Sequence, residues 1–115
     1  MTIVDTGKEK IISLINGALD TGSCGTSSSE VSASDTDLFA ELTSTIETLT
    51  GSESGKQLLI TYNLDSNGGN GNTLREYGNE LTDGTGDTLF NRVTFTGLPK
   101  TNALEVQIKS LVQVI

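Results

Sequence analysis

The sequence predicts a mainly β domain that begins with one α-helix. Between positions 104 and 114 the even residues are apolar apart from Ser110, while most odd residues are polar. Such alternation has the period of a strand, whose side chains point to opposite faces in turn. Ser, Thr, Gly and Asn are abundant and Pro occurs once, a composition that suits strands joined by turns. Apolar spacing typical of a helix appears near the N-terminus.

Residues 3–18 are predicted to form that helix. The apolar positions recur at helical spacing: Ile11, Ile12, Ile15, Ala18 and Leu19. Asp5 or Thr6 can cap the first turn, and Gly17 lies where a C-cap is expected. The apolar stripe is expected to pack on a sheet.

The middle of the chain is predicted to be loops around a first hairpin. Residues 20–37 are rich in Ser, Gly and Thr without periodicity, which indicates a mobile surface loop. Residues 42–64 resemble a hairpin that turns at 51–55, with the stronger alternation in its second arm. Residues 65–72 contain six Gly or Asn in a row and are expected to be the most flexible stretch.

The C-terminal part, residues 73–115, holds the remaining strands. A short strand is expected at 73–78, followed by a turn at 81–87. Residues 89–115 are predicted to form a long antiparallel hairpin, because two alternating segments flank the turn-like residues 97–102. Two strands are marginally stable in water, so other strands or a neighbouring subunit should cover the apolar face of this hairpin.

Length and composition bound the size of the core. The 115 residues have room for one domain, residues 1–115. The chain is 34% apolar and 4% aromatic with no Trp, so we expect a thin aliphatic core that favours support from a neighbour. No stretch approaches the ~20 apolar residues of a membrane span, and no signal-like segment opens the chain. We therefore expect synthesis in the cytoplasm and no membrane partner.

The charge argues against nucleic acid as a partner. The net charge is −8, and the seven Lys and Arg residues are scattered singly without forming a basic stripe. An acidic surface is also typical of a halophilic protein, because Asp and Glu favour solubility and high salt screens the repulsion between their charges. An ordinary acidic mesophilic protein accounts for the charge equally well.

The residue types give little support to enzyme chemistry. There is no His, which excludes a Ser-His-Asp relay and a His-based metal site within the chain. The Gly-rich run at 68–71 lacks the Lys-Ser/Thr of a phosphate-binding loop. Cys24 is the only cysteine, so no intrachain disulfide forms, and we interpret it as a small loop residue. We expect neither catalysis nor a cofactor.

Some acidic loop residues are weak candidates for binding a cation: Asp65, Asn67, Glu76, Asp83 and Asp87. The first three fall at positions 1, 3 and 12 of a loop that loosely resembles an EF-hand. Asn70 stands where the sharp-turn Gly is required, and Gly69 replaces a ligand. A flexible hairpin tip without a metal fits this loop better.

Three motifs in a fixed order resemble a known protein class. They are Asn-Gly-Asn-Thr-Leu-Arg-Glu-Tyr-Gly at 70–78, Leu-Phe-Asn-Arg-Val-Thr-Phe at 89–95 and Pro-Lys-Thr-Asn-Ala-Leu-Glu-Val at 99–106. Their order is similar to that in small virion structural proteins of tailed bacteriophages and archaeal tailed viruses, often described as tail or tail-fibre proteins. The likeness extends to the predicted helix and to residues 34–38.

This resemblance implies an antiparallel β-sandwich, here of about five to seven strands with the N-terminal helix. It implies a non-enzymatic virion subunit of the tail, baseplate or fibre, made in the host cytoplasm. Its expected partners are other virion proteins and further copies of the chain in a ring or trimer. A capsid-decorating or turret protein is an alternative, and so is a module that binds a host receptor or glycan through residues 20–34 and 65–72.

Four apolar residues are candidates for subunit contacts: Leu111, Ile115, Ile11 and Ile15. Leu111 and Ile115 interrupt the polar row of the last strand, which suits a surface completed by neighbours. Burial of both residues beneath the N-terminal helix is an equal alternative.

Overall fold

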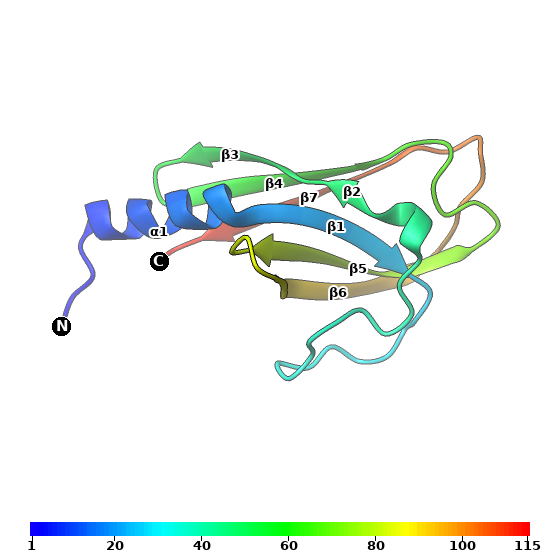
Figure 1. The fold of residues 1–115 in the computed structure, drawn as a ribbon, viewed down its shortest axis with the longest axis horizontal. Helices are drawn as coiled ribbons and strands as arrows, with labels where there is room; N and C mark the ends of the chain where they lie inside the picture. Colours follow the sequence, from blue (N-terminus) through cyan, green and yellow to red (C-terminus); the bar gives the residue numbers. More distant parts are fainter.

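The computed structural model describes residues 1–115 and consists of two antiparallel sheets that pack face to face (Figure 1). The elements in chain order are helix α1 (Asp5–Ala18), strand β1 (Leu19–Gly25), the 3₁₀ turn η1 (Thr43–Thr45) and strands β2 (Glu47–Thr48), β3 (Thr50–Ser54), β4 (Gln57–Leu64), β5 (Thr73–Thr82), β6 (Asp87–Pro99) and β7 (Val106–Gln113). The prediction of a mainly β sandwich with one N-terminal helix is therefore confirmed.

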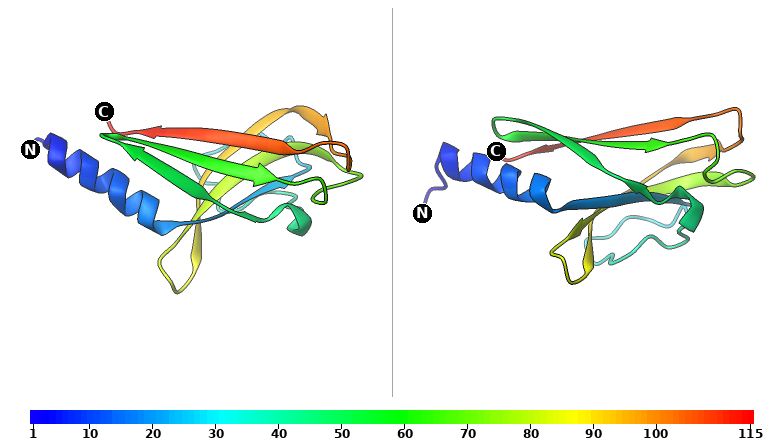
Figure 2. Two further views of the ribbon diagram at one scale, coloured as in Figure 1. Left: turned by 90° about the horizontal axis from the view of Figure 1, so that it is seen from above. Right: turned by 45° about the horizontal axis from the view of Figure 1, so that its top comes forward.

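The strands divide into two sheets of different size. Sheet A has the order β2-β1-β5-β6, and sheet B has the order β3-β4-β7. The chain passes between the sheets after β2, after β4 and after β6. Helix α1 continues the line of β1 and runs beside β3 and β4, at an end of sheet B that β5 and β6 do not reach (Figure 2). The helix thus takes the place of sheet A at that end.

The core lies between the sheets and is supplied by alternate residues of the strands. Its fully buried members are Ile12, Cys24, Leu49, Leu58, Ile60, Tyr62, Leu64, Leu74 and Tyr77. The two tyrosine rings meet edge to face, with centroids 4.9 Å apart, and link sheet B to sheet A. The Tyr62 hydroxyl donates to the Thr45 carbonyl at 2.6 Å, so this polar group is buried with a partner.

The predicted C-terminal hairpin of residues 89–115 is wrong. β6 pairs with β5 in sheet A, and β7 pairs with β4 in sheet B. An alternating pattern shows which face of a strand is apolar but does not identify the neighbouring strand. The connection instead crosses the sandwich, because Lys100 is hydrogen-bonded to the turn after β4: its N–H donates to Asn72, and its carbonyl accepts from Gly71.

The prediction of a mobile loop over residues 20–37 is wrong for its first part. Strand β1 lies between β2 and β5, and Cys24 belongs to the core. The small residues of β1 reflect crowding. A Cβ at Gly25 would lie 2.5 Å from the Ala40 carbonyl oxygen, and one at Gly22 would lie 2.8 Å from the Tyr62 ring. Burial raises the pKa of the Cys24 thiol to about 11, so this thiol is protonated at neutral pH.

Other boundaries shift by a few residues. Helix α1 begins at Asp5 after Val4, without a side-chain cap, and Gly17 lies inside it. The first hairpin consists of β3 and β4 and turns at Gly55, whose φ is +59°. Its predicted first arm, residues 42–49, is wrong, because these residues contain η1 and strand β2 of sheet A. The strand expected at 73–78 continues to residue 82. Residues 65–72 form turns that connect β4 of sheet B to β5 of sheet A, so they are not the tip of a hairpin.

Truncation of Leu58 should show how much the aliphatic core contributes to stability. Leu58 is fully buried between the sheets, so Leu58→Ala leaves a cavity and should lower the free energy of unfolding by about 2 to 5 kcal/mol. Leu111→Ala is the matched control, because Leu111 is 61% exposed and its loss should cost less than about 0.5 kcal/mol. Urea unfolding of both variants measures this; equal losses would contradict the assignment of the core.

Candidate functional site

The loop between β1 and η1, residues 26–42, covers the outer face of sheet A; we call it the strap. Tyr77 points into the core, so its neighbours Glu76 and Gly78 point to the opposite face of β5. The strap lies on that face: a Cβ at Gly78 would come within 2.9 Å of Leu38. Close packing of the strap on the sheet therefore depends on this glycine.

Arg92 on β6 fastens the strap to the sheet. Its Nε donates to Glu76 Oε1 at 2.9 Å, and its Nη1 lies 3.3 Å from Asp35 Oδ2 in the strap. Its Nη2 also donates to the Ser29 carbonyl at 3.0 Å, and Nη1 contacts the Glu30 carbonyl at 3.5 Å. The side chains of Arg92 and Glu76 are 1% and 0% exposed, so the charges are shielded from water and satisfied by each other.

Glu76 completes this network from β5. It accepts the backbone N–H groups of Phe39, Ala40 and Ser27 at 3.0, 2.8 and 3.3 Å. Burial alone would raise the pKa of Glu76, but the Arg92 guanidinium and these three N–H groups outweigh it and hold the pKa below 4.5. The Phe39 ring lies over the Arg92 guanidinium, 4.3 Å from ring centroid to Cζ. One carboxylate thus holds both ends of the strap.

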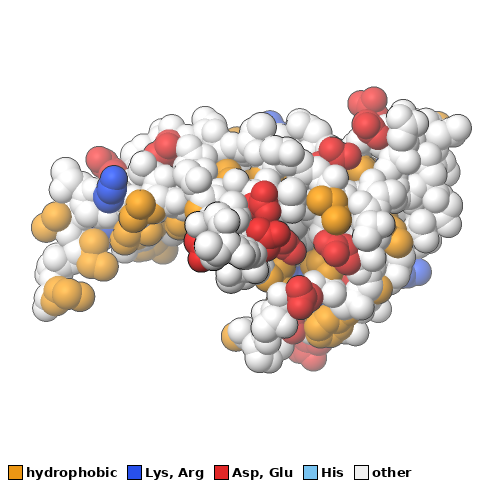
Figure 3. All heavy atoms as spheres, viewed as in Figure 1, with side chains coloured by type: hydrophobic (Ala, Val, Ile, Leu, Met, Phe, Trp, Pro, Cys, Tyr) orange, Lys and Arg blue, Asp and Glu red, His pale blue; other side chains and the backbone are white.

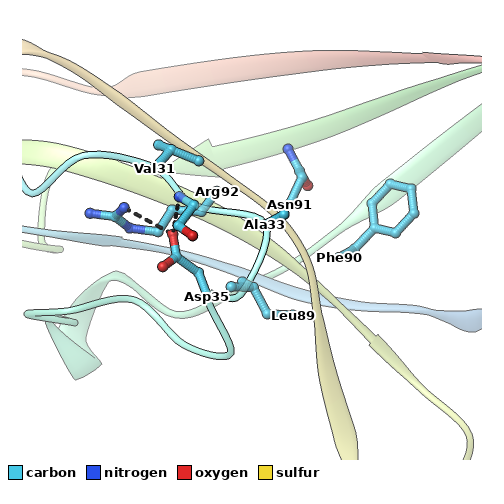
Figure 4. Close-up of a pocket in the computed structure, with 8 residues that line it drawn as sticks. Val31, Ala33, Asp35, Leu89, Phe90, Asn91 and Arg92 are labelled. Atoms are coloured by element: carbon cyan, nitrogen blue, oxygen red, sulfur yellow. Dashed lines mark hydrogen bonds and ion pairs between the residues drawn. The ribbon is translucent and has the colours of Figure 1, made fainter.

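A pocket of about 310 Å³ lies between the strap and the first half of β6 (Figure 4). Val31, Ala33 and Asp35 line it from the strap, and Leu89 and the adjoining residues through 92 line it from β6. Its charged groups are the Asp35 carboxylate and the Arg92 guanidinium, which bind each other. The pocket can therefore offer a ligand apolar side chains together with the uncharged polar residues Ser32 and Asn91.

Three carboxylates lie close together: Asp20 near the start of β1, Glu80 near the end of β5 and Asp87 at the start of β6. Oxygens of Asp20, Glu80 and Asp87 lie within 4.8 Å of one another, and carboxylates in such a group could bind a hard cation such as Ca²⁺. A hydrogen bond to the Asp87 carboxyl raises the pKa of Asp20. Burial, followed by the nearby carboxylates of Glu41 and Asp87, raises the pKa of Glu80. In Figure 3, Asp and Glu side chains gather over the middle of the molecule.

The cation candidates suggested by the sequence engage separate partners. Asp65 accepts the N–H of Asn67 at 2.8 Å within one turn, and Glu76 binds Arg92. Asp83 accepts the N–H of Thr85 at 2.8 Å in the β5–β6 turn. Asp87 is the one candidate that joins a group of carboxylates, together with two residues that the sequence did not single out.

The candidate contact residues occupy two surfaces. Leu111 and Ile115 are 61% and 98% exposed, so the N-terminal helix does not cover them. Ile15 of α1 is partly buried against the core, and Ile11 is also half-buried. Figure 3 shows apolar side chains gathered at the helix end of the molecule.

An apolar groove of about 230 Å³ opens between the sheets where β6 and β7 are the edge strands. Seven apolar residues line it: Cys24, Leu74, Val93, Phe95, Leu98, Val106 and Ile108. Val93 is 45% exposed, and Phe95 on the same face of β6 is partly buried against the core. The groove exists because β6 and β7 belong to different sheets. The sequence could not predict it, because the predicted hairpin paired these two strands with each other.

Sequence reasoning also missed the buried ion pair. Arg92 and Glu76 both lie on expected strands and have opposite charge, which is the signal that could have linked them. Their pairing required the β5–β6 register, in which Gly78 stands opposite Arg92. That register was not predicted, because β6 was assigned to another partner.

Comparison with known proteins leaves the family open. No protein-family model, no curated protein and no solved structure matches the chain. No helix here is both long enough and apolar enough to cross a membrane. The arrangement of the residues is therefore the basis for a functional assignment, together with the resemblance in motif order.

Loss of the Glu76 charge should destabilise the fold and change its response to acid. Glu76→Gln leaves Arg92 buried with a weaker set of partners, which should cost roughly 3 kcal/mol of unfolding free energy at neutral pH. The pKa of Glu76 is lower in the folded chain than in the unfolded chain, so its contribution is complete above the unfolded value and lost as pH falls through the folded value. Urea unfolding across acidic pH should show a shallower decline in the variant. Equal slopes for variant and wild type would contradict this role.

Removal of one acidic charge from the carboxylate group should stabilise the protein. The pKa of Asp20 is raised first by its hydrogen bond to Asp87 and the pKa of Glu80 first by burial, and repulsion between the carboxylates adds to both shifts. The folded state therefore binds protons more readily than the unfolded state, so the ionised group costs stability at neutral pH and this cost is relieved as pH falls. Asp87→Asn should therefore raise the thermal midpoint at neutral pH, with a smaller gain in high salt. Glu105→Gln, at an exposed position outside the group, is the control. A lower midpoint for Asp87→Asn would show that the three carboxylates do not repel each other.

Proposed function

We propose that the chain is a non-enzymatic structural subunit of a tailed-virus virion, in the tail, baseplate or fibre, that assembles through contacts with other subunits. The viral part of this proposal is supported by the ordered motifs at 70–78, 89–95 and 99–106. The assembly part is supported by the surface along β6 and β7. A capsid-decorating subunit would use the same surface.

The apolar groove is the observation that carries the assembly part. It is lined by apolar side chains alone, and it lies at an open side of the sandwich. Val93 within it is 45% exposed and costly to leave in water, at about 25 cal/mol for each Å² of apolar surface, and Leu111 is exposed on the other face of β7. Contiguous apolar surface of this kind marks contact sites in proteins. A neighbouring subunit would cover it.

Helix α1 offers a second apolar surface. Leu14 of α1 is 61% exposed, as are Ile3 and Val4 just before the helix at 47% and 62%, while Ile12 of the helix is fully buried. The helix therefore presents apolar residues on both its inner and its outer side. Only one side is covered within a single copy, which suits a subunit with neighbours on more than one surface.

The polar groups of the molecule support a structural role. Arg92, Glu76 and Asp35 bind one another and the strap backbone. Buried polar side chains have hydrogen-bond partners throughout, which suits a framework role. Polar residues that are fully satisfied within the fold stabilise it rather than supply reactive groups.

Two measurements test the proposal. Sedimentation of the purified chain should show assemblies larger than a monomer in high salt, where the repulsion between chains of charge −8 is screened. Antibodies against the chain should label tailed virus particles from cells that carry its gene, and the labelled part of the particle separates tail from capsid positions. Hydrolysis of a substrate by the chain, or particles that carry no label, would overturn the proposal.

A further inference from the structure

The free edge of β7 presents a row of unpaired backbone groups. β7 pairs with β4 over eight consecutive positions without a register shift. The N–H of Val114 donates to the Lys56 carbonyl in line with this register. The even residues of β7 therefore direct their backbone N–H and C=O groups toward β4. The odd residues Gln107, Lys109 and Leu111 therefore direct their N–H and C=O groups away from the sheet. Another strand can bond to such an edge.

The other edge strands are each protected against such pairing. β2 has only two residues. β3 is flanked by α1, where Asn16 donates to Glu53 of β3 at 2.7 Å (Figure 2). β6 has two register shifts in its pairing with β5 and ends in Pro99. Short length, cover, bulges and Pro are the devices by which natural sheets block edges. β7 has none of these four, and the one protecting feature on its edge is the charge of Lys109.

Charge also favours β7 for contact between two copies. Two chains of net charge −8 repel each other, yet β7 contains no Asp or Glu and a single Lys109. Each other edge strand contains an acidic residue: Glu47 in β2, Glu53 in β3 and Asp87 in β6. The approach of two β7 strands therefore meets the least repulsion.

We propose that two copies of the chain associate through β7 strands paired antiparallel about a two-fold axis, which joins the two B sheets into one. Pairing centred on Leu111 places this exposed side chain opposite its equivalent and sets Lys109 opposite Gln113. A register centred on Lys109 would instead oppose two like charges. The axis stands perpendicular to the joined sheet, so the apolar grooves of the two copies face each other.

This inference rests on the proposed assembly function and names its first contact. The two-fold pair extends sheet B through backbone hydrogen bonds and covers apolar surface of both grooves. Such an interface is self-complementary, since the same strand serves both copies. Further assembly can then use the exposed side of α1, which lies beside β3 on the opposite edge of sheet B.

A pair of matched substitutions tests the contact. Leu111 and Leu14 are both 61% exposed, so Leu111→Lys and Leu14→Lys alter side chain and net charge equally on β7 and on α1. In high salt, wild type and Leu14→Lys should sediment as dimers or larger even-numbered assemblies, while Leu111→Lys should lose the pairing and sediment at half the mass or less. Circular dichroism should show the same strand content in all three.

Disulfide trapping tests the register. Residues in a hydrogen-bonded antiparallel pair have Cα atoms about 5.5 Å apart, within the range that a disulfide spans. Leu111→Cys should therefore form a covalent dimer under mild oxidation. The wild type should not, because its native Cys24 is fully buried.

The outcomes separate this inference from the proposed function. If wild type assembles and Leu111→Lys assembles equally, the β7 contact is wrong while the assembly function stands. A wild-type chain that stays monomeric in high salt, with no disulfide at Leu111→Cys, would overturn the β7 contact. The proposed virion function would then be tested only by the antibody labelling of virus particles.

Discussion

The buried pair between Arg92 and Glu76 holds the strap to sheet A, and much of the fold depends on this contact. Glu76 binds backbone N–H groups at both ends of the strap, while Arg92 binds carbonyls and Asp35 in its middle. A long polar loop without its own core thus becomes an ordered layer. The same pair links neighbouring strands β5 and β6, so one interaction fixes a sheet and its cover together.

The sequence predicted the faces of the strands better than their partners. The alternation in β7 and β4 matches the observed burial, since even positions of both strands point inward. Pairing depends on contacts between distant segments, which a local pattern does not encode. β6 and β7 are consecutive and both alternate, yet Lys100 and its turn place them in different sheets. β1 was predicted to be a loop because its small residues resemble those of loops. In the structure they are small because neighbouring atoms leave no room for larger side chains at Gly22 and Gly25.

The candidate surfaces were foreseen in part. Leu111 could be singled out because an apolar residue interrupts a polar row, and it is exposed in the structure. The acidic candidates came from loop composition, and only Asp87 lies near other carboxylates. The groove between β6 and β7 could not be foreseen, because it requires the topology of both sheets.

The pairing of β4 with β7 has a consequence for how the chain is made. Gln57 stands opposite Gln113, so sheet B cannot be completed until the residues up to Gln113 have left the ribosome. Until then β4 keeps one edge open beside the apolar row of Leu58, Ile60 and Tyr62. Pairings between distant segments form slowly, and an exposed edge can be captured by another nascent chain. Synthesis of many copies side by side therefore places this protein at risk of strand exchange before it has folded.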